Sequence, residues 1–172
     1  CIGPDEAIEI KSWYGRVDHE GELAVAIGKR AKDVPPEQAR DYIAGYTLLN
    51  DVTARAMQKA DIERGDPWFR SKSLDTFCPI GPVLVFPEVL TWPLAEDLEV
   101  AVNGEIRQKS NTSKFIFDLP TLIAHVTRHI TLEPGDVIST GTPEGVSPLN
   151  PGDTVEVHAP GIGVLRNPVA GE

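Results

Sequence analysis

The sequence is poor in cysteine and contains no long apolar run. Its two cysteines, Cys1 and Cys78, lack the spacing of a zinc or redox motif, and a chain of 172 residues buries enough surface to fold without a disulfide. The longest apolar runs, Leu23–Ile27 and Val83–Phe86, are far shorter than the roughly 20 residues that a membrane-spanning helix needs. No segment has the charged start, apolar middle and small-residue cleavage site of a secretory leader. We therefore predict a cytoplasmic protein without a membrane partner, in which Cys78 is buried.

Basic residues are also scarce. The chain has 16 Lys and Arg against 26 Asp and Glu, which gives a formal net charge of −10. Nucleic acids and anionic membranes are polyanions that are bound by clustered Lys and Arg, and the sequence has no such cluster. This composition argues against a nucleic-acid partner and predicts a single domain over residues 1–172.

Several common catalytic motifs are absent too. The sequence has no serine nucleophile elbow, no P-loop and no dinucleotide fingerprint, so serine hydrolases, nucleotide hydrolases and Rossmann enzymes have no support. His125 and His129 have the i, i+4 spacing of zinc ligands, but no Glu lies between them. We therefore interpret both as ordinary residues on the flank of a helix.

The segments that are present are short and separated by glycine and proline, with 15 residues of each. Asn103-Gly104 predicts a tight hairpin, because both residues tolerate the positive φ of a type I′ turn. Strands are predicted at Leu23–Ile27, Tyr42–Leu49, Val83–Phe86, Leu98–Val102, Glu105–Gln108, Val137–Thr140 and Thr154–His158, and helices at Pro36–Asp41, Asp51–Ile62 and Leu119–Ile130. Short helices among many short strands indicate an α+β domain that is mainly β.

An acidic pair opens the first predicted strand. Glu20 and Glu22 share one strand face with Ala24 and Ala26, while His19 points to the opposite face. Two like charges on one face repel each other, and a solvated outer face is the ordinary explanation for such a pair. The small alanines beside the pair leave room for a bound species, which keeps a ligand site open as the second explanation.

Three further patterns combine charged, amide or hydroxyl side chains. Asp51, Arg55 and Gln58 lie at i, i+4 and i+7 of a predicted helix and would share one face, although an Asp at a helix start is commonly just a cap. Lys72 lies among aromatic and hydroxyl residues, where it could simply snorkel from an apolar stem. Thr142 lies in a glycine-containing turn that allows close approach to a ligand, although a turn needs no function.

Taken in order, these patterns resemble the fumarylacetoacetate hydrolase family from about Arg16 to Val169. The segments that carry the resemblance include Val17-Asp18-His19-Glu20-Gly21-Glu22-Leu23, Asn50-Asp51-Val52-Thr53-Ala54-Arg55 with Gln58, Lys72-Ser73-Leu74-Asp75-Thr76-Phe77, Val102-Asn103-Gly104-Glu105 with Gln108, and Thr140-Gly141-Thr142-Pro143-Glu144-Gly145-Val146. Each segment is short, and their shared order makes the match specific. The resemblance implies a fold of layered mixed β-sheets with a few short helices, a homodimer and a bound divalent ion.

The resemblance also implies a role for each candidate residue. Three carboxylates would hold Mg²⁺, with Mn²⁺ or Ca²⁺ as alternatives, because oxygen ligands suit these ions: Glu20, Glu22 and Asp51. Lys72 would be the catalytic residue that stabilises negative charge on the substrate. The substrate, a small anionic 2-oxo acid, would be bound by Arg55, Gln58 and Thr142.

The implied activity is cleavage or decarboxylation of short 2-oxo or 2,4-dioxo acids through a metal-stabilised enolate. Two alternatives stay open: an isomerase or decarboxylase of 2-hydroxyhepta-2,4-diene-1,7-dioate in aromatic catabolism, and a non-catalytic dimeric scaffold of the same fold. Family members usually carry a preceding segment whose His and Glu activate water, and Asp5-Glu6 is not that pair. We therefore expect the general base to lie upstream of Cys1.

Overall fold

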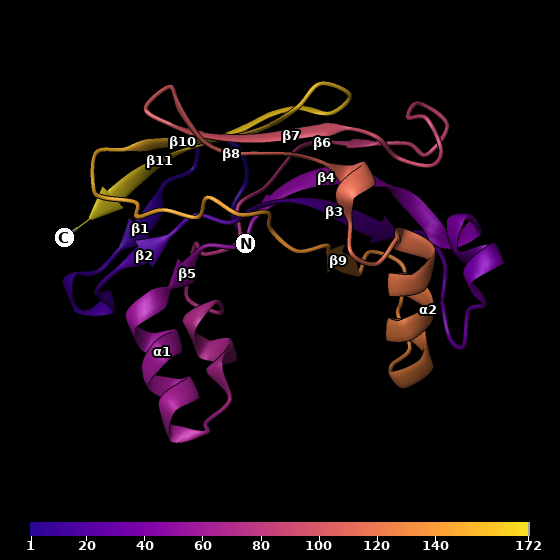
Figure 1. Ribbon diagram of the computed structural model, residues 1–172, viewed down its shortest axis with the longest axis horizontal. Coiled ribbons are helices and arrows are strands. Elements are labelled where there is room, and N and C mark those ends of the chain that lie inside the picture. Colours follow the sequence, from indigo (N-terminus) through magenta and orange to yellow (C-terminus); the bar gives the residue numbers. More distant parts are fainter. Residues whose placement is uncertain (172) are drawn as a thin grey trace.

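Two β-sheets form the frame of the computed structural model, which describes residues 1–171 (Figure 1). The first sheet has the strand order β1 (Ile8–Ile10), β11 (Gly163–Gly171), β10 (Thr154–Ala159), β7 (Asp97–Val102) and β8 (Glu105–Asn111). The second has the order β6 (Ile80–Val85), β4 (Ile43–Asn50), β3 (Gly21–Ile27) and β9 (Val137–Ser139). A short ladder joins β2 (Val17–Asp18) to β5 (Thr53–Ala54). Because β1 pairs with β11 in parallel while the other ladders are antiparallel, the sheets are mixed, and the predicted mainly β, α+β class is confirmed.

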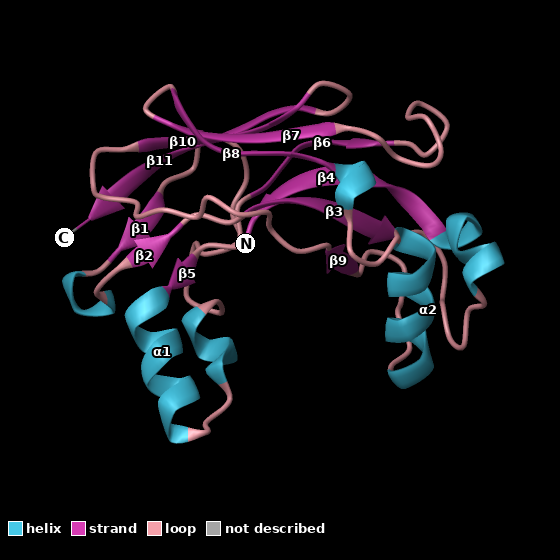
Figure 2. Cartoon of the chain, viewed as in Figure 1, coloured by secondary structure: helices cyan, strands magenta, loops and turns pink. Residues whose placement is uncertain are grey.

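The helices are short and lie outside the sheets (Figure 2). Helix α1 (Arg55–Arg64) packs beside the 3₁₀ helix η3 (Trp68–Ser71), and α2 (Leu119–His129) packs beside η2 (Pro36–Tyr42). Two further 3₁₀ turns are η1 (Ser12–Tyr14) and η4 (Thr112–Lys114). In this view both α-helices point away from the first sheet, with α1 packed against the β2–β5 ladder. Within residues 1–171, no helix is both long enough and apolar enough to cross a membrane.

The two sheets approach each other closely where β3 begins. A Cβ atom at Gly21 would overlap Val100 Cγ2 of β7 and would lie 3.2 Å from Val157 Cγ1 of β10. Both valines are buried. Glycine is therefore required at the start of β3, because any larger side chain would push the sheets apart.

The predicted hairpin is confirmed by the turn between β7 and β8. Asn103 and Gly104 both have positive φ, of 52° and 80°, as a type I′ turn requires. Val102 pairs with Glu105 directly across the turn. Local sequence was sufficient here because the two turn residues alone determine the backbone twist that joins the strands.

Helix α1 begins four residues later than predicted. Asp51 and Val52 are not helical, and Thr53 and Ala54 pair with Val17 and Asp18 before the helix starts at Arg55. The predicted common helical face of Asp51, Arg55 and Gln58 is therefore wrong, as is a helix-capping role for Asp51. The physical reason is that a ladder with a distant strand competes with helix formation in this segment, and a helical pattern in the sequence does not reveal that partner.

Other predictions differ from the structure in smaller ways. Helix α2 ends one residue before its predicted end, and Asp118 caps its start by accepting a hydrogen bond from the Thr121 backbone N–H at 2.9 Å. Val83 and Leu84, in the apolar run of β6, are exposed, so this run does not form a buried strand. Cys78 is half-buried rather than buried, and both cysteines are free. Strands β1, β2, β5 and β11 were not predicted.

Candidate metal and substrate site

Strand pairing brings the predicted carboxylates together. Gly21 at the start of β3 pairs with Asn50 at the end of β4, so the residues just outside these strand ends are neighbours. The Asp51 backbone N–H donates to the Glu20 carbonyl at 2.8 Å, and the Glu20 N–H donates to Asn50 Oδ1 at 2.9 Å. Residues 30 positions apart in the chain thus meet because two antiparallel strands share one end.

Glu20, Glu22 and Asp51 form a compact acidic cluster. One carboxylate oxygen of each residue lies within 4.8 Å of the others. Glu20 is 7% exposed and Glu22 is 3% exposed, so the interpretation of this pair as a solvated outer face is wrong. Buried like charges are costly unless cations or hydrogen-bond donors compensate them, and this requirement directs attention to the groups around the cluster.

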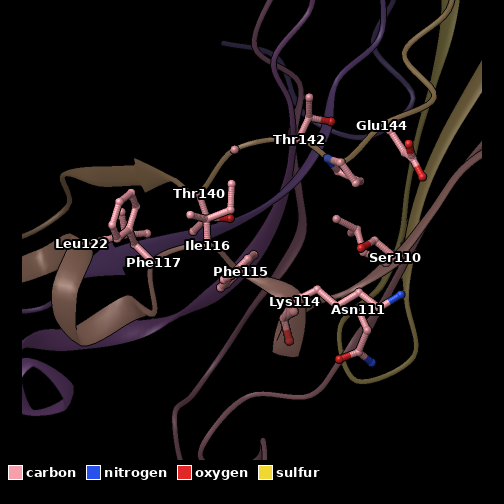
Figure 3. A pocket seen from close by; sticks show the side chains of 14 residues that line it. Ser110, Asn111, Lys114, Phe115, Ile116, Phe117, Leu122, Thr140, Thr142 and Glu144 are labelled. Atoms are coloured by element: carbon pink, nitrogen blue, oxygen red, sulfur yellow. The ribbon is translucent and has the colours of Figure 1, made fainter.

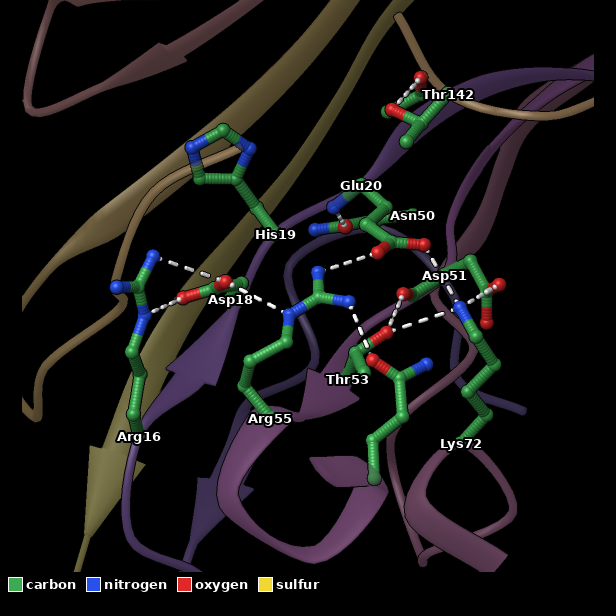
Figure 4. Close-up of polar contacts among 12 residues, drawn as sticks. Arg16, Asp18, His19, Glu20, Asn50, Asp51, Thr53, Arg55, Lys72 and Thr142 are labelled. Carbon is green, nitrogen blue, oxygen red and sulfur yellow. Dashed lines mark hydrogen bonds and ion pairs between the residues drawn. The ribbon is translucent and has the colours of Figure 1, made fainter. Parts of the chain in front are cut away.

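Lys72 supplies one compensating charge. It lies directly after η3, and its Nζ donates to Glu20 Oε2 at 2.7 Å, to Asp51 Oδ2 and to Thr53 Oγ1 at 3.0 Å (Figure 4). Although burial works in the opposite direction, hydrogen bonds and charge attraction from Asp51 and Glu20 raise the pKa of Lys72. The side chain is therefore a cation bound to two of the three carboxylates, not a residue that snorkels to solvent.

Glu22 has different partners from the other two carboxylates. Its Oε2 accepts hydrogen bonds from Ser139 Oγ and from the Gly141 backbone N–H, the latter at 2.6 Å. Both donors are neutral. Burial, followed by the nearby charges of Asp51 and Glu20, raises the pKa of Glu22 despite these hydrogen bonds. Burial likewise raises the pKa of Asp51, against the opposing effect of Lys72.

Asp18, which has no predicted role, also helps to hold Arg55 in the site. Asp18 is 1% exposed, and its carboxylate accepts from Arg55 Nε at 3.0 Å and from Arg16 Nε at 2.7 Å. Arg55 also contacts Glu20 Oε1 through Nη2 at 2.5 Å and donates from Nη1 to Gln58 Oε1 at 2.7 Å. The guanidinium is thus held by three oxygen acceptors at the first turn of α1.

The charged side chains of this network do not balance, and a bound cation would compensate the excess negative charge. Four carboxylates, Asp18, Glu20, Glu22 and Asp51, are grouped with three cationic side chains, Arg16, Arg55 and Lys72. One unit of negative charge remains. A divalent ion among the oxygen atoms of the acidic cluster would change the balance to one positive charge, which suits an anionic ligand. The donor set, oxygen atoms only, fits Mg²⁺ or Mn²⁺.

Thr142 is held against the β3 end of the site. Its hydroxyl Oγ1 donates to the Gly21 carbonyl at 3.0 Å and accepts from Gln108 Nε2 at 2.8 Å. Gly21 lies between Glu20 and Glu22, and Gly141, which precedes Thr142, donates to Glu22. The structure therefore brings all seven predicted site residues into one connected network, although Asp51 reaches it from a loop and not from the predicted helix face.

A cavity of about 420 Å³ is lined in part by the Thr140–Glu144 turn (Figure 3). Leu98, Phe115, Phe117 and Leu122 contribute much of its apolar lining. None of the three clustered carboxylates lines this cavity. The turn is shared between the cavity and the acidic cluster: Thr142 lines the cavity, and the backbone N–H of Gly141 donates to Glu22.

Several residues of the site were not assigned from the sequence. Asp18 and Gln108 carried the family resemblance but no role, and Ser139 carried no signal at all. His125 and His129 stack edge to face with each other at 5.0 Å between ring centroids, as flank residues of α2. The role of Ser139 depends on the pairing of β9 with β3, which places it opposite Ala24.

The chain is similar in sequence to proteins of one enzyme family. Residues 1–170 match the family model described as fumarylacetoacetate (FAA) hydrolase C-terminal. An uncharacterized protein of Pyrococcus abyssi is 51% identical over 99% of this chain and 76% of its own length. The oxaloacetate tautomerase YisK of Bacillus subtilis is 44% identical over 90% of this chain and 52% of its own length.

Solved structures share the fold at high similarity. The 5-carboxymethyl-2-hydroxymuconate delta-isomerase of Mycobacterium smegmatis has a TM-score of 0.93 and 45% identity, over 99% of this chain and 65% of that one. Fumarylpyruvate hydrolase of Pseudomonas aeruginosa, solved in complex with Mn²⁺ and pyruvate, has a TM-score of 0.93 and 33% identity, over 99% of this chain and 74% of that one. The chain therefore spans about half to three quarters of the length of these proteins.

Proposed function

The chain belongs to the fumarylacetoacetate hydrolase family, and from this premise we propose that it is a divalent-metal-dependent enzyme acting on short 2-oxo or 2,4-dioxo acids. Cleavage or decarboxylation of such acids is the first candidate reaction. The observation that carries the proposal is the buried cluster of Glu20, Glu22 and Asp51 beside Lys72. The Mn²⁺ and pyruvate bound by the fumarylpyruvate hydrolase relative support both the ion and the substrate class.

We propose that the metal ligands are Glu20, Glu22 and Asp51, with Mg²⁺ preferred on donor type and Mn²⁺ or Ca²⁺ as alternatives. When bound, the ion would supply positive charge that stabilises the negative charge developing on the 2-oxo oxygen of the substrate. The ion would also relieve the unfavourable burial of Glu22, whose present partners are a hydroxyl and a backbone N–H.

The side chains around the cluster define how a substrate would be held. Lys72 stays protonated because, against the opposing effect of burial, its carboxylate partners raise its pKa. Its three N–H groups donate to Glu20, Asp51 and Thr53 in this structure, so one of them would have to turn to an enolate oxygen to stabilise it. Arg55 and Gln58 form a hydrogen-bonded pair that would orient the substrate from α1. The Thr142 hydroxyl donates to Gly21 in this structure, so it would have to turn that hydrogen toward a substrate carboxylate to bind it. His19 is not the general base in this proposal, because both of its ring nitrogens already have partners.

Isomerisation or tautomerisation of the same class of acid is the second candidate reaction. The oxaloacetate tautomerase and the muconate isomerase are 44% and 45% identical to this chain, whereas the fumarylpyruvate hydrolase is 33% identical. These reactions use the same enolate but move a proton and leave the carbon chain intact. A non-catalytic scaffold is disfavoured, because a scaffold has no need to bury three adjacent carboxylates at a cost in stability.

Turnover assays with the purified protein test these proposals. Oxaloacetate, an acylpyruvate and a hydroxy-diene-dioate would each be supplied with Mg²⁺, with Mn²⁺ or with excess chelator, and carbon-chain cleavage would be followed separately from keto–enol conversion. We expect activity that requires the metal and falls at least about 100-fold in Glu22→Gln. Glu63→Gln, an exposed glutamate on α1, is the matched control. Chelator-insensitive turnover, or full activity in Glu22→Gln, would contradict the metal site.

A homodimer is also proposed, by analogy with the family. Exposed apolar side chains in and near β6, including Val83, Leu84 and Phe86, are of the kind that a subunit contact covers.

A further inference from the structure

A second buried polar network lies behind the Thr142 turn and centres on Gln108. This residue belongs to β8 in the first sheet, yet its side chain reaches β3 in the second sheet. Gln108 is 1% exposed, and its neighbour His19 is completely buried. A buried amide between two sheets needs a full set of partners, because a buried donor or acceptor left without a hydrogen bond destabilises the folded protein.

Every hydrogen-bonding position of the Gln108 amide is used. Its Oε1 accepts from the Gly21 backbone N–H at 3.2 Å and lies 2.9 Å from His19 Nδ1. Its Nε2 donates to Thr142 Oγ1 at 2.8 Å and to the Pro143 carbonyl at 2.7 Å. Two acceptor and two donor contacts are the complete capacity of an amide side chain.

These contacts also determine which group donates and which accepts in each hydrogen bond of the network. The Pro143 carbonyl can only accept, so the nitrogen of the Gln108 amide must face it and the oxygen must face His19. His19 Nδ1 therefore carries the proton and donates, while His19 Nε2 accepts from Ser147 Oγ at 2.8 Å. The Thr142 hydroxyl, which accepts from Gln108, directs its own hydrogen to the Gly21 carbonyl at 3.0 Å.

Both ends of this chain of hydrogen bonds adjoin the acidic cluster. Gly21 lies between Glu20 and Glu22, and Gln108 contacts its N–H while Thr142 contacts its carbonyl. The turn that Gln108 holds also contains Gly141, whose N–H donates to Glu22. A shift of the Gln108 side chain would therefore move the backbone between the two glutamates and the hydroxyl next to them.

We propose that Gln108 is a positioning residue for the site, which fixes the Thr142 hydroxyl and the Gly21 backbone, and that His19 in turn fixes Gln108. The inference rests on the proposed function for the meaning of the site. Neither residue touches the reacting atoms. Their effect passes through Thr142 and Gly21, which distinguishes them from side chains that merely fill the space between the sheets.

A double-mutant cycle tests the link to Thr142. Gln108→Met keeps the volume and removes all four hydrogen bonds, and Thr142→Val removes the hydroxyl. We expect each single variant to lower kcat/KM about 10- to 100-fold, the usual effect of removing a group that orients a ligand. The double variant should be no worse than the poorer single variant, because both changes remove the same placement of the hydroxyl. Losses that multiply in the double variant would overturn the proposal.

The His19 side chain offers a matched pair of variants. Asn at this position places an amide nitrogen near the site of Nδ1, so His19→Asn can still donate to Gln108. His19→Gln places its amide near the site of Nε2, so it can keep the contact with Ser147 but loses the contact with Gln108. We expect Mn²⁺ affinity and kcat/KM to fall about tenfold further in His19→Gln than in His19→Asn. Equal losses in the two variants would indicate a packing role alone and would overturn the proposal.

Two measurements keep this test separate from the proposed function. Titration with Mn²⁺ alone reports on the carboxylates without any substrate, so the variants can be ranked even if wild-type protein converts none of the acids. Hydrogen exchange of the Gln108 side-chain NH₂, followed by NMR in metal-free protein, reports on the network itself. We expect strong protection, reduced in His19→Gln while the fold is retained. Rapid exchange in the wild type would show that the amide is not held and would overturn the inference whatever the activity.

Discussion

The buried carboxylates of the site differ in the partners that hold them. Asp18 meets two guanidinium groups, and Glu20 meets Arg55 and Lys72. Within residues 1–171, the hydrogen-bond donors to the Glu22 carboxylate are only the Ser139 hydroxyl and the Gly141 backbone N–H. Because charged donors form stronger hydrogen bonds than neutral ones, Glu22 has the least compensation for its burial. The effects of substitution should therefore differ from one carboxylate to the next.

Lys72 is the residue from which we expect the largest effect on the chemical step. Replacing it with Met removes the N–H donors next to the proposed substrate oxygen, so kcat with saturating Mg²⁺ should fall about 10²- to 10³-fold. Lys109→Met, at an exposed lysine that pairs with Glu99, should leave kcat unchanged. Steady-state kinetics with oxaloacetate would measure both variants, and a Lys72→Met enzyme with normal kcat would remove this residue from catalysis.

Glu22→Gln should weaken metal binding at the acidic cluster and raise the stability of the metal-free protein. Burial raises the folded-state pKa of Glu22 above its unfolded value of about 4.3, so the native state binds more protons and the metal-free protein loses stability as pH rises between these values. A neutral Gln avoids this loss. We expect the metal-free variant to have a higher Tm than wild type near pH 7, with about 2–4 °C for each kcal/mol gained in a chain of this size.

The pH dependence supplies the control for this prediction. The difference in Tm should disappear below about pH 4, where Glu22 is protonated in both states. Added Mn²⁺ should raise the Tm of the wild type and leave that of Glu22→Gln unchanged. Scanning calorimetry in chelator and in Mn²⁺ measures both effects, and a variant that is less stable than wild type at neutral pH would contradict the argument.

At the scale of the elements, the contact between the sheets places the acidic cluster. Gly21→Ala would force a methyl group onto Val100 of the facing sheet. Overpacking of this kind costs about 1–3 kcal/mol in the free energy of unfolding. Val100→Ala makes room for the new methyl group, so the double variant should recover part of the loss. Urea denaturation measures the cycle, and an additive result would show that the two side chains do not compete for the same space.

An ion-pair cluster joins α1 to η3, the element that precedes Lys72. Asp61 on α1 accepts from Arg70 Nε at 2.7 Å and from Arg70 Nη2 at 2.6 Å, and Arg64 contacts the same carboxylate at 2.5 Å. These arginines, Arg70 first, lower the pKa of Asp61. The ion pair between Asp61 and Arg70 holds η3 against α1. It therefore also positions the backbone of Lys72, which directly follows η3.

Asp61→Asn should therefore lower both the Tm and kcat at neutral pH. The contribution of Asp61 is fully present above its unfolded pKa of about 3.9 and is lost as pH falls through its lower folded-state pKa. The difference in Tm between wild type and variant should accordingly narrow as the pH falls below about 3.9. Asp66→Asn, at a neighbouring exposed aspartate that also contacts Arg64, is the control. A difference in Tm that grew toward low pH would contradict the lowered pKa of Asp61.

At the scale of the whole molecule, most of the net charge of −10 lies outside the site. The site network holds one negative charge, and a divalent ion would reverse its sign. An anionic substrate would thus approach an acidic protein whose site is locally positive only with the metal bound. Substrate affinity should therefore depend on the bound metal for two reasons. The ion makes the site locally positive, and it would also contact the substrate directly.

The oligomeric state is a prediction for the whole molecule. A homodimer would have about twice the chain mass of 18.7 kDa. Light scattering coupled to size exclusion would measure this mass over a dilution series, with the chelated protein as a second sample to separate dimerisation from metal binding. A monomeric mass at every concentration would contradict the dimer.

The sequence by itself determined the features that depend on neighbouring residues. Asn103-Gly104 specified its hairpin because positive φ is a property of these two residues, and the apolar stripe from Leu119 specified α2 to within one residue. The order of the family segments pointed to Glu20, Glu22, Asp51 and Lys72 as candidate site residues. These inferences needed no knowledge of which strands lie side by side.

Only the tertiary structure decided which distant residues meet. The pairing of β3 with β4 places Asp51 beside Glu20, the β2–β5 ladder delays α1 to Arg55, and the packing of the sheets brings Gln108 to Gly21. Strand register and sheet packing are set by the summed burial of many side chains, so no single segment encodes them. The sequence therefore supplied the chemical groups of the site, whereas their shared burial, their charge balance and the residues that hold them follow from the fold.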